Sequence, residues 1–248
     1  MTSTLGTSRP GACGDDSAVA ARLVLVAERL CDSADLRAGW RVLDVGTGTG
    51  DGALAAARLG CAATGIDPAP ALLDRARSRA AAEGLDVELL QGDPSSLPFA
   101  DASFDAVMSL FGAAFLPDAA PELLRVCKPG GTIALAAWTE DGFVGELLRT
   151  LGRHARPEDD PLALIGDGVA SLELTEQTFT FRFESPKCLV DSFRLWHAPT
   201  AAAFAAVDGD LRGALETELA ALARRFDRLG AEAIAIPATY VEAIALRR

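Results

Sequence analysis

The chain has 248 residues, half of them hydrophobic, and a formal net charge of −12. This length allows one large core, and the acidic balance excludes partners that need a basic surface, such as a nucleic-acid backbone or an anionic membrane. No stretch approaches the roughly 20 apolar residues that span a bilayer, and no secretory signal is visible at the amino end. We therefore expect a cytoplasmic protein, either a monomer or a homodimer.

The five cysteines are widely scattered and contain no C-x-x-C pair, and the chain has only two histidines. This pattern argues against a disulfide framework and against a metal site, so each cysteine is expected to be a small buried or incidental thiol. Residues 1–15 are rich in small and polar side chains and are expected to be disordered. Residues 16–248 are expected to form a single domain.

A first helix is predicted over residues 16–35, with Leu23, Val26 and Leu30 on one apolar stripe. Strands and helices then alternate. The predicted strands are 41–45, 62–66, 86–91, 104–110 and 132–138. The predicted helices between them are 51–59 with Gly60 as its stop, 68–83 with Gly84 as its stop, and 121–127, which a tight turn at 128–131 follows. Such alternation is typical of parallel strands with right-handed crossovers, so we predict an α/β fold with a doubly wound sheet.

The pattern changes beyond Thr139. A helix is predicted near 142–154, a strand at 172–183 and a last strand at 240–246. About 55 residues of mainly helical sequence separate these two strands, beginning with a helix that Ser185 caps and including a long helix that Gly230 ends. We expect a ligand-binding core at 36–140 and, within the C-terminal part 141–248, a helical lid at about 184–232.

The most informative segment is 42–50, which reads Val-Leu-Asp-Val-Gly-Thr-Gly-Thr-Gly. Alternating glycines remove the Cβ atoms from the turn after a buried strand, so a bulky ligand can lie directly against the backbone. Other groups follow later strands, at the sheet edge where such folds bind ligands. Asp67 stands at the offset of a ribose-binding carboxylate, Asp93 can accept from an exocyclic amine, and residues 109–112 form an apolar lip. These features together predict an adenosine site.

Residues 48–53 also match G-x-G-x-x-A, a motif of dinucleotide-binding proteins. Asp44 and Asp51 would repel a pyrophosphate at the start of the following helix, and no Arg or Lys is expected to compensate. The arginines at 75, 77 and 79 are interpreted as a solvated helix face. The charges therefore favour a cationic, phosphate-free nucleoside, and an NAD-type oxidoreductase is the least favoured alternative.

Several motifs together resemble those of class I S-adenosylmethionine-dependent methyltransferases. They are the glycine-rich segment 42–50, Gly65-Ile66-Asp67, Gly92-Asp93, the segments 97–99 and 104–105, and the run Arg-Val-Cys-Lys-Pro-Gly-Gly at 125–131. The likeness is closest to the small-molecule branch that resembles the ubiquinone and menaquinone methyltransferases, and it is specific over about residues 36–140. It implies a Rossmann-like seven-stranded sheet of order 3-2-1-4-5-7-6, the last strand antiparallel, with a helical lid. It also implies S-adenosyl-L-methionine as methyl donor and S-adenosyl-L-homocysteine as product.

Carried over by position, the resemblance implies that eleven residues contact this cofactor. They are Asp44 facing the ammonium, Gly46, Thr47, Gly48 and Gly50 in the loop, Ser109 and Phe111 on the sulfonium side, Asp67 at the ribose, and Asp93, Pro68 and Pro94 at the adenine. Many relatives carry cysteine or alanine where Thr47 stands, so an extra hydroxyl contact is possible here. No metal is implied.

Methyl transfer from a sulfonium is an in-line displacement, so positioning supplies much of the rate and a base is needed only where the acceptor loses a proton. The two histidines are His154 and His197. His197 is favoured as the base because it lies in the predicted lid, and a surface position at a helix end is the alternative for both. The expected function is methyl transfer to O, N or C of a small, apolar or aromatic molecule. The alternative is a cofactor-binding cyclase or regulator without methyl transfer.

Overall fold

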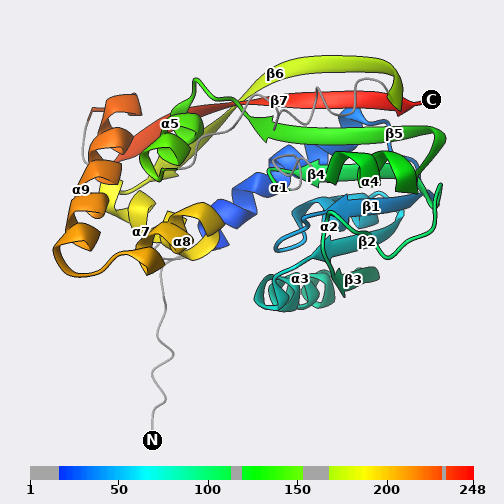
Figure 1. Ribbon diagram of the computed structural model, residues 1–248, viewed down its shortest axis with the longest axis horizontal. Helices are drawn as coiled ribbons and strands as arrows, with labels where there is room; N and C mark the ends of the chain where they lie inside the picture. Colours follow the sequence, from blue (N-terminus) through cyan, green and yellow to red (C-terminus); the bar gives the residue numbers. More distant parts are fainter. Residues whose placement is uncertain (1–16, 113–118, 153–167, 231–232) are drawn as a thin grey trace, which may run out of the picture. The chain divides into compact units, whose positions relative to one another are not determined.

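The computed structural model describes residues 17–112, 119–152, 168–230 and 233–248 (Figure 1). The strands are β1 (Arg41–Val45), β2 (Ala62–Asp67), β3 (Val87–Gln91), β4 (Phe104–Leu110), β5 (Cys127–Trp138), β6 (Val169–Phe183) and β7 (Ile234–Arg247). The helices are α1 (Ser17–Ser33), α2 (Asp51–Arg58), α3 (Pro70–Glu83), α4 (Ala119–Val126), α5 (Phe143–Thr150), α7 (Pro186–Trp196), α8 (Ala198–Ala206) and α9 (Gly209–Phe226). His154 and residues 1–15, for which predictions were made, lie outside the described residues.

The strands form one seven-stranded sheet of order β3-β2-β1-β4-β5-β7-β6. β1 pairs in parallel with β2 and with β4, and further parallel pairs join β2 to β3 and β4 to β5. β7 runs antiparallel to β5, with Trp138 opposite Tyr240. The predicted doubly wound sheet, its strand order and its antiparallel last strand are confirmed.

The described residues divide into two compact units. One unit contains residues 17–22, 140–152, 178–230 and 233–238, and therefore α5, α7, α8 and α9. The other contains residues 23–112, 119–139, 168–177 and 239–248, and therefore the parallel strands with α2, α3 and α4. The helices predicted at about 184–232 belong to the first unit, and the predicted cofactor residues belong to the second.

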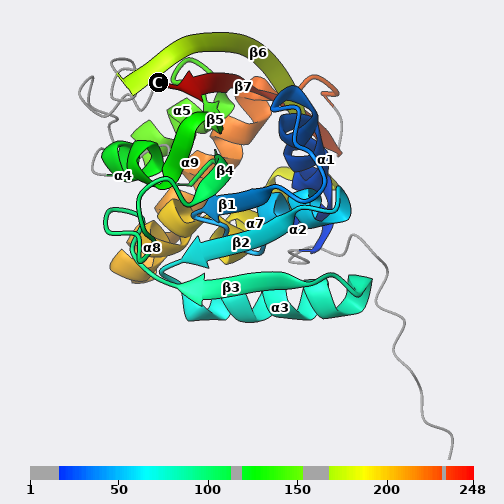
Figure 2. The same ribbon diagram turned by 90° about the vertical axis from the view of Figure 1, so that its right-hand side faces the viewer.

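In the second unit, alternate residues of β1 face opposite sides of the sheet. Leu43 and Val45 are fully buried in a core cluster with residues of α4, including Leu123 and Val126. Asp44 points the other way, since its carboxylate accepts a hydrogen bond from the backbone amide of Ala53 in α2. α2 and α4 therefore cover opposite faces of the sheet at this point (Figure 2).

β5 begins earlier than predicted. The residues Lys128 to Gly131 were predicted as a tight turn before the strand, but they belong to β5, which begins at Cys127. Phe104 pairs with Cys127, Ala106 pairs with Thr132, and the register shifts between the two pairs. Gly130 takes a positive φ of 73°. Residues 128–131 therefore form an irregular, turn-like excursion inside β5, and regular pairing with β4 resumes at Thr132.

The long helix α9 also ends differently, at Phe226 and not at Gly230. The carboxylate of Asp227 accepts hydrogen bonds from the amides of Leu229 at 3.0 Å, Gly230 at 2.8 Å and Ala235 at 2.8 Å, and these bonds turn the chain out of the helix. At the start of α7, by contrast, the hydroxyl of Ser185 accepts from the amide of Cys188, as the predicted cap requires.

Three of the cysteines are buried free thiols as expected, namely Cys31, Cys61 and Cys127. The expectation was wrong for Cys188, which is disulfide-bonded. Over the described ranges of the chain, no group of three or more metal-ligating side chains is found, and no helix is long and apolar enough to cross a membrane.

Candidate functional site

The glycine-rich turn between β1 and α2 has a backbone that favours glycine at three positions. Gly46, Gly48 and Gly50 have positive φ values of 70°, 54° and 90°. The amides of Gly46 and Thr47 both donate to the carbonyl of Ile66, at 2.9 and 3.0 Å, and so fasten the turn to β2. A Cβ placed on Gly48 would meet no atom within 4 Å. The turn is therefore fixed on its β2 side and open at Gly48, where a ligand can approach the backbone.

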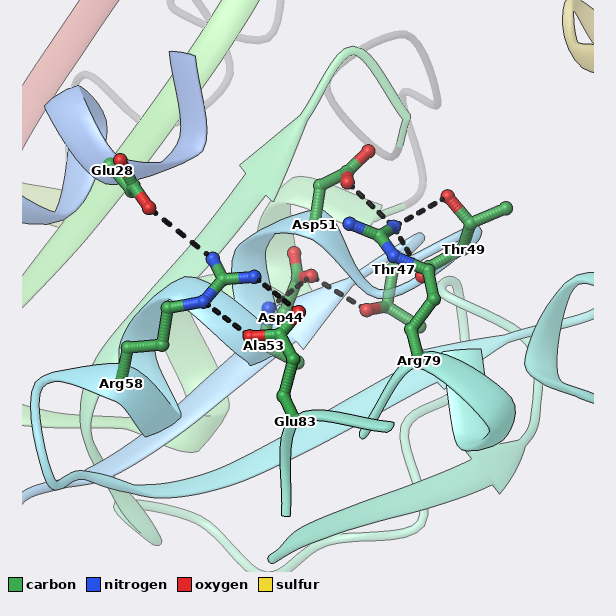
Figure 3. Close-up of polar contacts among 9 residues, drawn as sticks. All are labelled: Glu28, Asp44, Thr47, Thr49, Asp51, Ala53, Arg58, Arg79 and Glu83. Atoms are coloured by element: carbon green, nitrogen blue, oxygen red, sulfur yellow. Dashed lines mark hydrogen bonds and ion pairs between the residues drawn. The ribbon is translucent and has the colours of Figure 1, made fainter. Parts of the chain in front are cut away.

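Asp44 is buried below this turn with 1% of its surface exposed. Its Oδ2 accepts hydrogen bonds from the Thr47 hydroxyl at 2.6 Å and from the Ala53 amide at 2.9 Å. Figure 3 shows both donors reaching the same carboxylate oxygen. The other oxygen, Oδ1, is buried and has no hydrogen-bond partner in the described part of the chain. Burial raises the pKa of this carboxyl to about 7, against the two hydrogen bonds that favour its ionised form.

Two glycines make room for the Asp44 and Thr47 side chains. A Cβ on Gly52 would lie 2.6 Å from Asp44 Oδ2, and a Cβ on Gly65 would lie 2.8 Å from Thr47 Oγ1. Both distances are too short for any side chain other than hydrogen. Neither glycine has a role that the sequence alone indicates, although Gly65 is part of the family resemblance.

Asp67 ends β2 beside the same turn and is 6% exposed. Its Oδ2 accepts from the amide of Gly48 at 2.9 Å, and its Oδ1 accepts from the amide of Ala69 at 2.8 Å. A carboxylate has about four acceptor positions, so these bonds orient Asp67 and leave capacity for two further donors. The structure thus brings together the turn and the carboxylate predicted for a ribose.

The end of β3 lies next to the end of β2. The amide of Gly92 donates to the carbonyl of Asp67 at 3.2 Å. Asp93, one residue further, is exposed, and its Oδ1 accepts from the amide and the hydroxyl of Ser95 at 2.8 and 2.7 Å. These bonds lower the pKa of Asp93. Of the two prolines predicted at the adenine, Pro94 is buried and Pro68 is exposed.

Beyond β4, the predicted apolar lip contacts the glycine turn. The Ser109 side chain is buried, and its hydroxyl donates to the carbonyl of Val45 at 2.7 Å, which ties β4 to the end of β1. A Cβ on Gly112 would lie 3.0 Å from the carbonyl oxygen of Gly46. The backbones of the lip and the turn are therefore in close contact. In the sheet, β1 lies between β4, which carries the lip, and β2, which carries Asp67.

Phe111 belongs to an aromatic cluster that the sequence analysis did not assemble. Its backbone has a positive φ of 55°, which is uncommon for a bulky residue. Its ring stacks on Trp138 with centroids 4.0 Å apart, and the edge of Tyr240 meets both rings, at 5.6 and 5.9 Å. Trp138 closes β5 and lies opposite Tyr240 in β7. The sequence signal that could have predicted this cluster is Trp138, an aromatic residue at the end of the strand next to β4.

One electrostatic expectation was wrong. Arg79 of α3 forms an ion pair with Asp51 at 2.7 Å and donates to the carbonyl of Thr49 at 2.8 Å, so a basic residue does compensate Asp51 (Figure 3). Arg79 is 25% exposed and is not part of a solvated face. The spacing of Arg79 from Ala76 could have indicated this contact, because residues three apart share a helix face. Ala76 packs against the turn, and a Cβ on Gly50 would lie 3.0 Å from the Ala76 Cβ. Asp44 and Asp67 are then the turn's uncompensated carboxylates among the described residues.

His197 lies in the first unit, between the end of α7 and the start of α8. Its Nδ1 is 2.7 Å from the hydroxyl of Thr200, a residue with no exposed surface. The rings of Phe193 and Trp196 lie 5.5 and 5.6 Å from the imidazole. The histidine is therefore held in one orientation by a hydrogen bond and by two aromatic neighbours, and its role as a base stays a prediction.

Comparisons with known proteins agree with this fold. A family model described as a methyltransferase domain matches residues 42–131. Protein Rv1405c of Mycobacterium tuberculosis is 37% identical over 217 residues, which cover 79% of this chain and 79% of that protein. A demethylmenaquinone methyltransferase of Deinococcus radiodurans is 36% identical over 148 residues, 57% of this chain and 61% of that protein.

Two solved structures share the fold. The YcgJ protein of Bacillus subtilis has a TM-score of 0.61 at 21% identity and covers 90% of this chain and 99% of its own. The cyclase SpnF has a TM-score of 0.56 at 22% identity and covers 90% of this chain and 80% of its own. The sheet order, the glycine turn and these similarities identify the class: the chain belongs to the class I S-adenosylmethionine-dependent methyltransferase family.

Proposed function

We propose that this protein transfers the methyl group of S-adenosyl-L-methionine to O, N or C of a small, apolar or aromatic acceptor. The observation that carries the proposal is Asp44, whose buried Oδ1 lacks a partner within the described residues next to a turn that is open at Gly48. A buried carboxylate oxygen that accepts no hydrogen bond is costly unless a ligand supplies the hydrogen-bond donor. The ammonium group of S-adenosyl-L-methionine can supply it.

The residues of the turn fit this donor group by group. Asp44 would hold the ammonium, the backbone of Gly46 to Gly48 would lie along the methionine part, and Asp67 would accept from the ribose hydroxyls. Asp93, Pro68 and Pro94 would contact the adenine. When bound, the donor supplies an electrophilic methyl carbon. A hydroxyl or amine acceptor would also release a proton, which would pass to His197 in the role considered below or to water.

The aromatic cluster of Phe111, Trp138 and Tyr240 supports an apolar or aromatic acceptor. It lies in the same unit as the glycine turn, and Gly112, next to Phe111, contacts that turn. Flat aromatic rings stack favourably on planar apolar molecules and exclude water from the reacting atoms. The relative named demethylmenaquinone methyltransferase agrees with this choice of acceptor class.

The proposal predicts that the purified protein binds S-adenosylhomocysteine in a calorimetric titration and forms methylated products. The assay supplies S-adenosylmethionine with a methyl label to a panel of phenols, quinols, aromatic amines and activated carbon acids. Label should appear in at least one aromatic acceptor, with one S-adenosylhomocysteine formed per methyl group. NAD serves as the control ligand and should not bind. Absence of S-adenosylhomocysteine binding would reject the proposal.

A second function keeps the fold and the cofactor but not the transfer. SpnF, a cyclase, shares this fold, so the fold by itself does not specify methyl transfer. Binding of S-adenosylhomocysteine together with no labelled product across the whole panel would favour this alternative over methyl transfer.

The candidate base gives a separate prediction. If His197 removes a proton from a phenolic acceptor, His197→Ala lowers turnover by about 100-fold, at the lower end for general-base catalysis, and leaves S-adenosylhomocysteine affinity unchanged. The loss should shrink for nitrophenols, which ionise without help at neutral pH. Thr200→Val, which removes one hydrogen-bond partner of the imidazole, should give a smaller loss. Unchanged turnover of His197→Ala would reject His197 as the base.

A further inference from the structure

The hydrogen bond from Thr47 to Asp44 carries an inference that rests on the proposed function and deepens it. We propose that Thr47 is a positioning residue, whose side-chain hydroxyl acts on the cofactor only through Asp44, by keeping that carboxylate ionised and leaving its Oδ1 for the cofactor's ammonium. Affinity for the amino-acid part of the cofactor then depends on a hydroxyl that does not touch it.

The Thr47 hydroxyl is committed to Asp44 by its surroundings. The side chain is 6% exposed, and its donor–acceptor distance of 2.6 Å is short, as expected for a hydroxyl that donates to a carboxylate. A Cβ on Gly65 would lie 2.8 Å from Thr47 Oγ1 and 2.9 Å from Cγ2, so both branches of the side chain pack against β2. A hydroxyl has a single proton to donate, and here that proton goes to Asp44 Oδ2.

The charges around Asp44 make the hydrogen bond from Thr47 important for the ionisation of this carboxyl. Among the described residues, Asp44 interacts electrostatically with Cys31 of α1, Asp51 of α2 and Asp67 of β2. The two aspartates disfavour its ionised form, as burial does. Arg79, the cation of the glycine turn, forms its ion pair with Asp51. Within the described residues, the hydrogen bonds from Thr47 and the Ala53 amide are the influences that favour the ionised carboxylate. Removing the Thr47 hydroxyl removes one of these two hydrogen bonds.

A proton linkage follows. An ammonium binds a carboxylate and not a carboxylic acid, so binding to a group with a pKa of about 7 must displace its proton at lower pH. Affinity for S-adenosylhomocysteine should therefore be constant above pH 8 and fall about tenfold between pH 8 and pH 6. Without the Thr47 hydroxyl, the midpoint of this fall should move upward by about one pH unit, the value of one hydrogen bond to a charged group.

The experiment compares wild type, Thr47→Val and Thr47→Ser by calorimetric titration from pH 6 to pH 9, with two ligands. One is S-adenosylhomocysteine, and the other is 5′-methylthioadenosine, which has the same nucleoside without the amino-acid part. At pH 7, Thr47→Val should weaken S-adenosylhomocysteine about fivefold or more and methylthioadenosine less than about twofold. Thr47→Ser retains the hydroxyl and should restore both the affinity and the pH midpoint.

The outcomes separate this inference from the proposed function. If wild type does not bind S-adenosylhomocysteine, the proposed function fails. If wild type binds and Thr47→Val changes neither the affinity nor the pH midpoint, or weakens both ligands equally, the role of Thr47 is overturned and the proposed function stands. Thr47→Ala removes the same hydroxyl by deleting atoms only, and it replaces Thr47→Val should that variant not fold.

Discussion

Asp67→Ala should reduce the affinity for S-adenosylhomocysteine at least about 100-fold. In the proposed complex the carboxylate accepts from both ribose hydroxyls, and each hydrogen bond to a charged group contributes about 1.5 kcal/mol or more, so the loss of two amounts to about 3 kcal/mol. The substitution also leaves the amides of Gly48 and Ala69 without their acceptor, which loosens the turn at the position where the ligand approaches. Calorimetric titration at pH 8 measures the effect.

The matched control for this variant is Asp74→Ala. Asp74 is a carboxylate on the exposed surface of α3 that pairs with Arg77 at 2.9 Å. Its removal takes away the same charge from the same unit, and affinity should stay within about twofold because exposed ion pairs contribute little. Equal affinities for Asp67→Ala and Asp74→Ala would reject the ribose assignment. Thermal unfolding of both variants shows whether any loss of binding reflects a loss of fold.

Gly52→Ala should destabilise the protein by about 2–3 kcal/mol, although alanine is the better helix former. Gly52 lies in α2, and its added methyl group would lie 2.6 Å from Asp44 Oδ2 and 2.7 Å from Cγ. Either the helix or the buried carboxylate must move, and both bonds that orient Asp44 are then strained. Urea denaturation measures the free energy of unfolding, and S-adenosylhomocysteine affinity should fall in the same variant.

A second helical glycine provides the comparison. Gly213 in α9 has no neighbour within 4 Å of its added methyl group and no positive φ. Gly213→Ala should therefore increase the free energy of unfolding by about 0.5–1 kcal/mol and leave cofactor affinity unchanged. If Gly52→Ala were as stable as Gly213→Ala and bound the cofactor as wild type does, the close packing of Asp44 against α2 would not be required.

Much of the sheet could be predicted because its signals are local. β1 and β4 have the predicted bounds, since each is a short apolar run with polar or small residues on either side. The strand order 3-2-1-4-5-7-6 came from the family resemblance, and it could not have been deduced from hydrophobic pattern alone. β5 and α9 were predicted with wrong ends because both ends depend on contacts with other segments. The start of β5 depends on its irregular pairing with β4, and the end of α9 depends on the hydrogen bond between Asp227 and Ala235.

Part of the site could also be predicted, because some of its residues have local signals in the sequence. Asp44 and Asp67 lie at the ends of β1 and β2, and the turn glycines follow β1, so their meeting at one edge of the sheet could be inferred. Arg79 and the aromatic pair of Phe111 with Trp138 meet across different elements, and sequence spacing does not specify such contacts. The hydrogen bond between Thr47 and Asp44 spans three residues, but its significance depends on burial by α2, which the sequence does not reveal.

The helices α7, α8 and α9 all lie in the sequence between β6 and β7, which are neighbours in the sheet. The chain therefore leaves the sheet from one strand and returns to it on the adjacent strand, after the five parallel strands β1 to β5 have been completed. A whole set of helices can thus be exchanged for that of a relative by one contiguous replacement, with no change in the residues that form the glycine turn. Under the proposed function, chimeric proteins of this kind would test whether these helices determine which acceptor is methylated.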